Sequence, residues 1–301
     1  MPMVLLGYFL GALFFTGLFQ GGVLEALTAG AAGVVAGLCV MGLSKLEVNF
    51  FFKTIAAAAV LGMVIYGLRA LGLPVDTGIA AISALMVLVP GLVFTNFMCD
   101  LITGDMVSGL STFVRAVLTA TAIAIGTGVA LGLFQTLGLA AEGVGNREDY
   151  GAVLQCLAAF LACSGFCVMY NVHGWGVVLC CLGGALGWAV YLAMGMVTGS
   201  IYLRYLVAGI AIAAYAEAMA RVRKYPITAY LVVSFFPLVP GSYIYYAMYY
   251  AIQGQRQLFL ESGIQALGLA SCLAIGTLLV STTVRTCVTW RRERRMKRDT
   301  L

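Results

Sequence analysis

Residues 88–105, which read LVPGLVFTNFMCDLITGD, decide the fold because an apolar helix must break within them. Pro90 lacks a backbone N–H and disfavours helix at the preceding residue, and Gly91 weakens the next turn. Polar side chains follow at once, at Thr95, Asn96, Asp100 and Asp105. Inside a membrane, irregular backbone and polar groups are tolerated only where protein or a water-filled cavity covers them. The stretch therefore predicts a substrate site.

The same element recurs 150 residues later, since 238 − 88 = 150 and residues 238–241 again read LVPG. Residues 274–277 repeat the AIGT of residues 124–127 at that offset. Gly33, Gly37 and Val40 match Gly183, Gly187 and Val190 in the same register. Several blocks at one offset indicate an internal duplication.

The composition indicates an integral membrane protein. Of 301 residues, 62% are hydrophobic and 10% are charged, and the mean hydropathy is +1.01, which leaves too little polar surface for a soluble globule. The apolar runs are close to the ~20 residues that a helix needs to cross the hydrocarbon, and they lack the alternation of barrel strands. We expect an all-α polytopic protein, and the N-terminus has no basic region typical of a signal peptide.

Ten membrane spans are predicted, two of them broken at Pro-Gly. They cover residues 3–19, 23–43, 50–71, 78–102, 107–138, 151–170, 174–195, 201–220, 226–251 and 262–290. This divides the chain into a first five-helix repeat at 1–138, a connector at 139–150, a second repeat at 151–290 and a basic tail at 291–301. Glycines at helical spacing, at 30, 33 and 37 and again at 183, 184 and 187, predict close helix packing.

Lys and Arg place both termini in the cytoplasm and the connector outside. Five spans per repeat is an odd number, so the second repeat must be inverted relative to the first. Inverted repeats with broken helices at matching positions are typical of secondary transporters, whose site lies near the midplane.

Each Pro-Gly break should begin a half-helix whose unpaired N–H groups attract a carboxylate. Pro90, Gly91, Pro240 and Gly241 are therefore candidate binding residues, with Thr95, Asn96 and Ser242 adding hydrogen bonds. Ser242 could instead cap its half-helix, and a proline kink that only shapes packing is the alternative for either break.

A polar face on the fifth span supplies further candidates, with Ser108, Ser111, Thr112, Arg115 and Thr119 at helical spacing. Ser108 and Arg115 are assigned to substrate binding. Arg115 should pair with Asp100 or Asp105, and a purely structural ion pair is an equal alternative.

Three acids could carry a coupling charge: Asp100, Asp105 and Glu217. Glu217 could instead pair with Arg221, four residues on. An enzymatic metal site at Asp100 and Asp105 is disfavoured because no histidine or third carboxylate is nearby, and His173, the single histidine, fits a turn better than a proton relay. We expect no metal or other cofactor, and the nine cysteines, without a CxxC pair, are read as apolar packing residues. The basic tail indicates contact with anionic lipid rather than nucleic acid.

The chain resembles the threonine/serine exporter family in both halves. The first half carries Val89-Pro90-Gly91, Thr95-Asn96, Asp100-Leu101, Gly104-Asp105, Ser108-Gly109 and Arg115; the second carries Tyr170-Asn171-Val172, residues 183–188, Ala216-Glu217 and residues 237–242. The chain departs from the family pattern at Cys99, where an arginine is expected, at His173, where a proline is expected, and in lacking a cytosolic domain ahead of the first span.

This resemblance implies a secondary transporter of the bacterial cytoplasmic membrane that exports threonine or serine by proton-coupled antiport, and no enzyme activity. It leaves open a dicarboxylate exporter of the succinate type, because split two-chain relatives are linked to that activity. A membrane subunit that needs a soluble partner is open as well, and an intramembrane enzyme acting on lipid is less favoured. The expected partners are a small-molecule substrate, protons and the lipid bilayer, with a homo-oligomer or a soluble partner domain left open.

Overall fold

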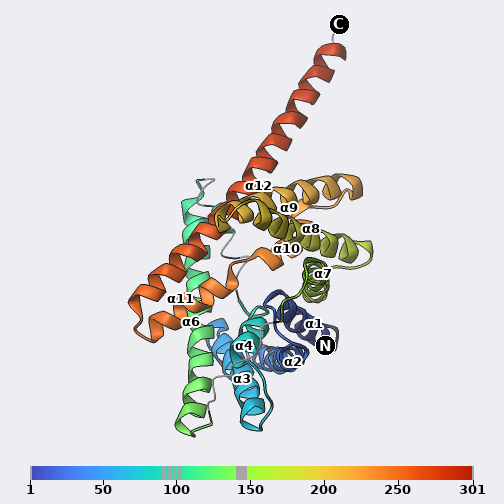
Figure 1. Cartoon of the computed structure of the whole chain (residues 1–301). Helices are drawn as coiled ribbons and strands as arrows, with labels where there is room; N and C mark the ends of the chain where they lie inside the picture. The colour runs from blue at the N-terminus through green and yellow to red at the C-terminus, as the bar shows by residue number, and fades with distance from the viewer. Residues whose placement is uncertain are drawn as a thin grey trace.

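The computed structural model describes residues 2–89, 93, 96–97, 99–100, 104–139 and 148–299; for 252, 288–289 and 291–299 only the backbone is described. Every regular element in these ranges is a helix (Figure 1). The helices are α1 (Pro2–Leu18), α2 (Val23–Lys45), α3 (Phe50–Ala70), α4 (Thr77–Leu85), α6 (Met106–Thr136), α7 (Ala152–Met169), α8 (Trp175–Val197), α9 (Ile201–Arg223), α10 (Ile227–Phe235), the 3₁₀ turn η1 (Phe236–Leu238), α11 (Gly241–Ile252) and α12 (Arg256–Asp299).

The expectation of an all-α polytopic membrane protein is confirmed. Seven of the described helices are long and apolar enough to cross a membrane, and the bent pair Ile227–Leu238 with Gly241–Ala251 gives an eighth. The predicted first span is α1, a shorter apolar helix of 17 residues. The predicted span at 78–102 lies partly outside the described residues.

The two halves repeat the same helix pairs. Thr77 begins α4 and Ile227 begins α10, and both helices have nine residues; Met106 begins α6 and Arg256 begins α12. Both differences equal 150, the offset of the sequence repeat (227 − 77 and 256 − 106). Helix α1 packs on α2 as α7 packs on α8, α3 on α6 as α9 on α12, and α2 on α4 as α8 on α10.

The halves meet along α1 and α7, which lie side by side (Figure 1). Gly7 and Gly11 of α1 face Gly165 of α7 so closely that a Cβ added to Gly165 would lie 2.5 Å from the Gly11 nitrogen and 2.8 Å from the Gly7 oxygen. Because the facing residues on both helices are glycines, which have no side chain, the two backbones can approach this closely.

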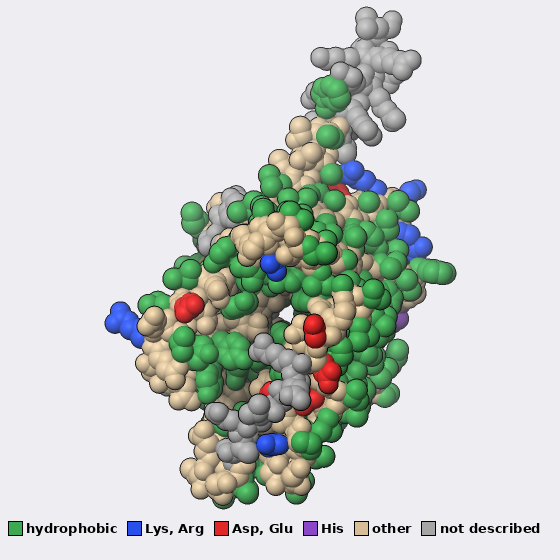
Figure 2. Space-filling model, in the orientation of Figure 1, with side chains coloured by type: hydrophobic (Ala, Val, Ile, Leu, Met, Phe, Trp, Pro, Cys, Tyr) green, Lys and Arg blue, Asp and Glu red, His purple; other side chains and the backbone are tan. Residues whose placement is uncertain are grey.

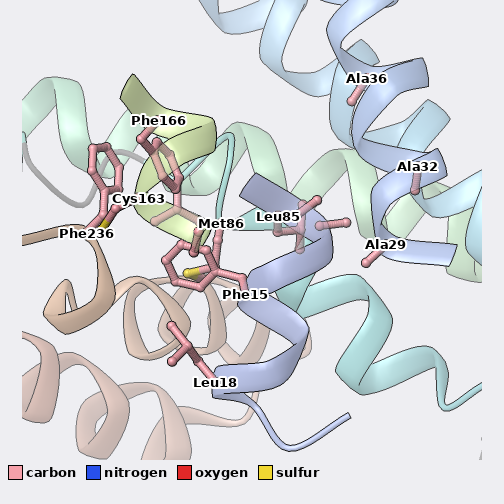
Figure 3. Packing of buried hydrophobic residues seen from close by; sticks show 14 of the residues in the cluster. Phe15, Leu18, Ala29, Ala32, Ala36, Leu85, Met86, Cys163, Phe166 and Phe236 are labelled. Atoms are coloured by element: carbon pink, nitrogen blue, oxygen red, sulfur yellow. The ribbon is translucent and has the colours of Figure 1, made fainter. Parts of the chain in front are cut away.

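Aromatic rings fill the core beside this contact (Figure 3). Phe166 of α7 stacks on Phe236, with ring centroids 3.6 Å apart, and meets the edge of Phe15 of α1 at 5.7 Å. Phe236 begins the turn that precedes Pro240, so the core holds the broken span against α7.

Helix α12 is longer than predicted at both ends. It begins at Arg256 rather than at 262 and runs on to Asp299, through the residues read from sequence as a tail (Figure 1). The tail sequence RRERRMKR consists of residues with high helix propensity, and no glycine or proline interrupts it.

Candidate functional site

The second break has the predicted position. After η1, the backbone leaves helical geometry at Val239, and Pro240, at φ −75° and ψ 46°, precedes the first residue of α11, Gly241. The two parts of the span make an angle of 57°. The bend follows from proline chemistry, because Pro240 cannot donate to the preceding turn.

The second break contacts the residues just ahead of the first break. A Cβ added to Gly241 would lie 2.9 Å from Cγ1 of Val89 and 3.1 Å from both Sδ and Cε of Met86. Val89 directly precedes Pro90, so the start of α11 packs against the chain as it enters the first break. Pro90, Gly91 and Thr95 themselves lie outside the described residues.

The segments that follow the breaks are also in contact. Phe97 is 2% exposed and belongs to one apolar cluster with Ile244 of α11 and Ala116 of α6; Val93 and Tyr243 pack against that cluster. Asn96, the neighbour of Phe97, is helical and exposed. The chain thus brings residues from both Pro-Gly elements to one place between α6 and α11.

The N-terminus of α11 offers hydrogen-bond donors. No side chain caps this helix, and among the described residues no acceptor faces the backbone N–H of Ser242 or Tyr243. Ser242 is half-buried and does not cap α11, which was one of its two predicted roles. Free N–H groups and the positive end of a helix dipole together form a site suited to a carboxylate.

Ser108 joins the two predicted coupling acids of the first half. Its hydroxyl donates to Oδ2 of Asp100 at 2.8 Å, and its backbone N–H donates to Oδ1 of Asp105 at 3.1 Å. Asp100 is half-buried, whereas Asp105 is exposed and is the N-cap of α6. Asp105 therefore has a structural role as the cap of α6.

Asp105→Ala should destabilise the protein by about 1 kcal/mol, because the first turn of α6 loses its cap. Asp105→Asn should retain wild-type stability, since asparagine caps as well as aspartate. Thermal unfolding of the purified protein in detergent measures both variants. Equal melting temperatures for alanine and asparagine would contradict the capping role.

The expected ion pair of Arg115 with Asp100 or Asp105 is not formed. Arg115 is exposed, and its guanidinium lies over the Phe50 ring, 5.9 Å from the ring centre. Over the described part of the chain, the single ion pair joins Arg221 to Glu217 at 3.3 Å. Thr119 and Ser111 of the predicted polar face bond to carbonyls of their own helix, so this face is satisfied locally.

Glu217 takes the structural alternative named from sequence, since its carboxylate is 17% exposed and is bound by Arg221. Sequence reasoning missed Glu25, an acid that is buried. It is 8% exposed, and its Oε1 accepts the Asp76 backbone N–H at 3.0 Å, which fixes the loop leading into α4. The sequence did carry a signal for this residue, because an acidic side chain at the third position of an apolar helix needs a partner.

Sequence reasoning also passed over the tyrosines of α11, whose sequence is GSYIYYAMYYAI. Tyr245 is 8% exposed, and Tyr246 and Tyr250 stack with ring centres 5.8 Å apart. The half-helix that follows the second break therefore presents aromatic rings with hydroxyl groups. The repeated tyrosines in an otherwise apolar helix were a signal in the sequence from which these rings could have been predicted.

Among the described residues, no group of three His, Cys, Asp or Glu side chains is placed to hold an ion. None of the nine cysteines forms a disulfide with another, and Cys163, Cys167, Cys180 and Cys181 are buried.

Two family models match the chain, one in each half. Residues 155–283 match the model described as "Threonine/Serine exporter, ThrE", and residues 1–134 match a second threonine/serine exporter model. No curated protein and no solved structure matches the chain.

Proposed function

Because this chain belongs to the threonine/serine exporter family, with both membrane modules in one polypeptide, we propose that it exports a small carboxylate-bearing metabolite, threonine or serine first, as a secondary transporter. The observation that carries the proposal is the contact of Gly241 with Val89, which joins the two Pro-Gly elements at the uncapped start of α11.

The substrate carboxylate would sit at the N-terminus of α11. The Ser242 and Tyr243 N–H groups would donate to it, and the Ser242 hydroxyl and Asn96 would add polar contacts. A helix end of this kind binds an anion without placing a cation in the membrane, where an unpaired charge is costly. Pro90 and Gly91 would begin an equivalent half-helix, with its own unpaired N–H groups, in the first half.

The two halves would be inverted repeats around this site. Their matching helix pairs and the shared offset support the assignment of residues 1–138 and 151–290 as repeats. Five spans in each would place both termini in the cytoplasm and the site near the midplane. Alternating access would then follow from rocking one repeat against the other.

Asp100 would carry the coupling proton. Asp105 is exposed and Glu217 is ion-paired with Arg221. Asp100 is half-buried, accepts the Ser108 hydroxyl and lies on the segment that follows the first break. A carboxylate in that position can exchange a proton as substrate binds and leaves.

Inverted membrane vesicles containing the full chain test the proposal. With an imposed proton gradient, they should accumulate labelled serine or threonine, and collapse of the gradient should abolish accumulation. Labelled succinate, supplied in parallel, decides between an amino-acid exporter and a dicarboxylate exporter. The assignment would be contradicted if the vesicles transported none of the three substrates.

A further inference from the structure

A polar cavity lies away from the Pro-Gly elements, between the α7–α8 turn and the α9–α10 turn. Its volume is about 390 Å³, within the range of small-ligand sites. Its polar lining comes from Tyr170, Asn171, His173, Gly176, Arg223 and Tyr230. Figure 2 shows Lys and Arg side chains gathered along the edge of the molecule where α8 begins and α9 ends.

The charge around this cavity is positive and uncompensated. Arg223, the last residue of α9, forms no ion pair with any described residue, and no acidic side chain lines the cavity. Glu217, the acid nearest in sequence on α9, is already bound by Arg221. Lys224, directly after Arg223, is also positively charged but does not line the cavity.

Hydrogen-bond donors face the same space. Tyr230 is only 3% exposed and lines the cavity, yet no described residue accepts from its hydroxyl. Gly176 lies in the first turn of α8, which no side chain caps, so its N–H also lacks a helical partner. Tyr170 lines the same cavity, and its hydroxyl, like that of any tyrosine at neutral pH, is protonated and able to donate.

We propose that this cavity binds a phosphate group, either the headgroup of an anionic phospholipid or a free phosphate anion. A guanidinium, a tyrosine hydroxyl and the N-terminus of a helix are donors suited to phosphate oxygens. Two exposed aromatic side chains line the cavity, Tyr225 at 62% and Tyr170 at 52% exposure, and Trp175, 71% exposed, directly precedes Gly176 in the chain. Such residues gather at the headgroup level of a bilayer, which supports the lipid as the source.

A bound phosphate would tie three helices together. Tyr230 belongs to α10, which leads to Pro240, while Gly176 and Arg223 belong to α8 and α9. The Ser234 hydroxyl already joins α10 to the Cys180 carbonyl of α8 at 3.1 Å. Occupancy of the cavity should therefore stabilise this part of the fold whether or not substrate is present.

Native mass spectrometry of the purified full chain tests the lipid arm, with phosphatidylglycerol as probe and phosphatidylcholine as the zwitterionic control. Arg223→Gln and Tyr230→Phe should each weaken phosphatidylglycerol binding by about tenfold, as expected for loss of one charge-assisted hydrogen bond. Lys224→Gln is the matched control: it removes the same charge one residue away from the cavity, and should bind as the wild type does.

Inorganic phosphate tests whether the ligand is a free phosphate anion. If a free anion is the ligand, millimolar phosphate raises the melting temperature of the wild type and of Lys224→Gln, but not of Arg223→Gln or Tyr230→Phe. The proposal is overturned if neither probe binds, or if Lys224→Gln loses as much binding as Arg223→Gln, which would indicate a diffuse basic surface. Should Arg223→Gln fail to fold, Tyr230→Phe, which removes a single oxygen atom, decides alone.

Discussion

Replacement of Gly165 by leucine should abolish the recovery of folded protein, whereas the same change at Gly128 of α6 should be tolerated. The Cβ of any side chain at Gly165 meets the backbone of Gly11 and Gly7, and main-chain atoms of a packed helix cannot move aside as a side chain can. Overpacking of a core costs about 1–3 kcal/mol, and more where whole helices must separate. Gly128 has no atom within 4 Å of its Cβ position.

Alanine substitutions at the same two glycines should shift the melting temperature in opposite directions. Alanine in place of glycine in a helix interior favours the helix by about 1 kcal/mol, so Gly128→Ala should raise the melting temperature. Gly165→Ala should lower it, because even one methyl group must push α1 and α7 apart. Thermal unfolding in detergent measures both variants, and a rise at both positions would contradict the contact between α1 and α7.

Helix positions were predictable because they depend on local properties of the chain. Apolar length and the residues that end helices set the boundaries, and the 150-residue offset recurs in the starts of α4, α10, α6 and α12. The second break follows directly from Pro240. The run of α12 past 290 was missed because charge was read as the end of the helix, although arginine, lysine and glutamate are good helix formers.

Contacts between helices could be predicted only in part. Gly33 and Gly37 do pack closely on α1, since a Cβ on either would lie 2.9 Å from atoms of Tyr8. The closer contact of Gly7 and Gly11 with Gly165 carried a signal, two glycines four residues apart, but the sequence does not say which helix will face them. Partner choice depends on the packing of the whole bundle.

The same limit explains why the ion pair expected of Arg115 is not formed. Arg115 lies seven residues after Ser108, and proximity in sequence favoured its pairing with an aspartate. The rotation of α6 instead turns Arg115 to an exposed face over Phe50. Asp105 was predicted as a coupling acid from its place near the membrane edge, and the structure adds that it is the N-cap of α6.

Asp100→Asn should reduce gradient-driven accumulation of substrate to the background level while the protein remains folded and inserted. Asparagine keeps the shape of the side chain and can still accept the Ser108 hydroxyl that Asp100 accepts at 2.8 Å, so the local structure should survive. The change removes the group proposed to gain and lose the coupling proton. Exchange of substrate across the membrane should continue, because binding rests on the N–H groups at the start of α11.

Asp105→Asn is the matched control for Asp100→Asn. Both remove one carboxylate within the same turn region, and Ser108 contacts both, yet asparagine preserves the cap of α6 and should leave pumping at the wild-type rate. Accumulation and exchange are measured in the same vesicles, which separates loss of coupling from loss of binding. Full pumping by Asp100→Asn would refute its coupling role. The next acid to test would then be Glu217, whose replacement by glutamine leaves Arg221 without its partner.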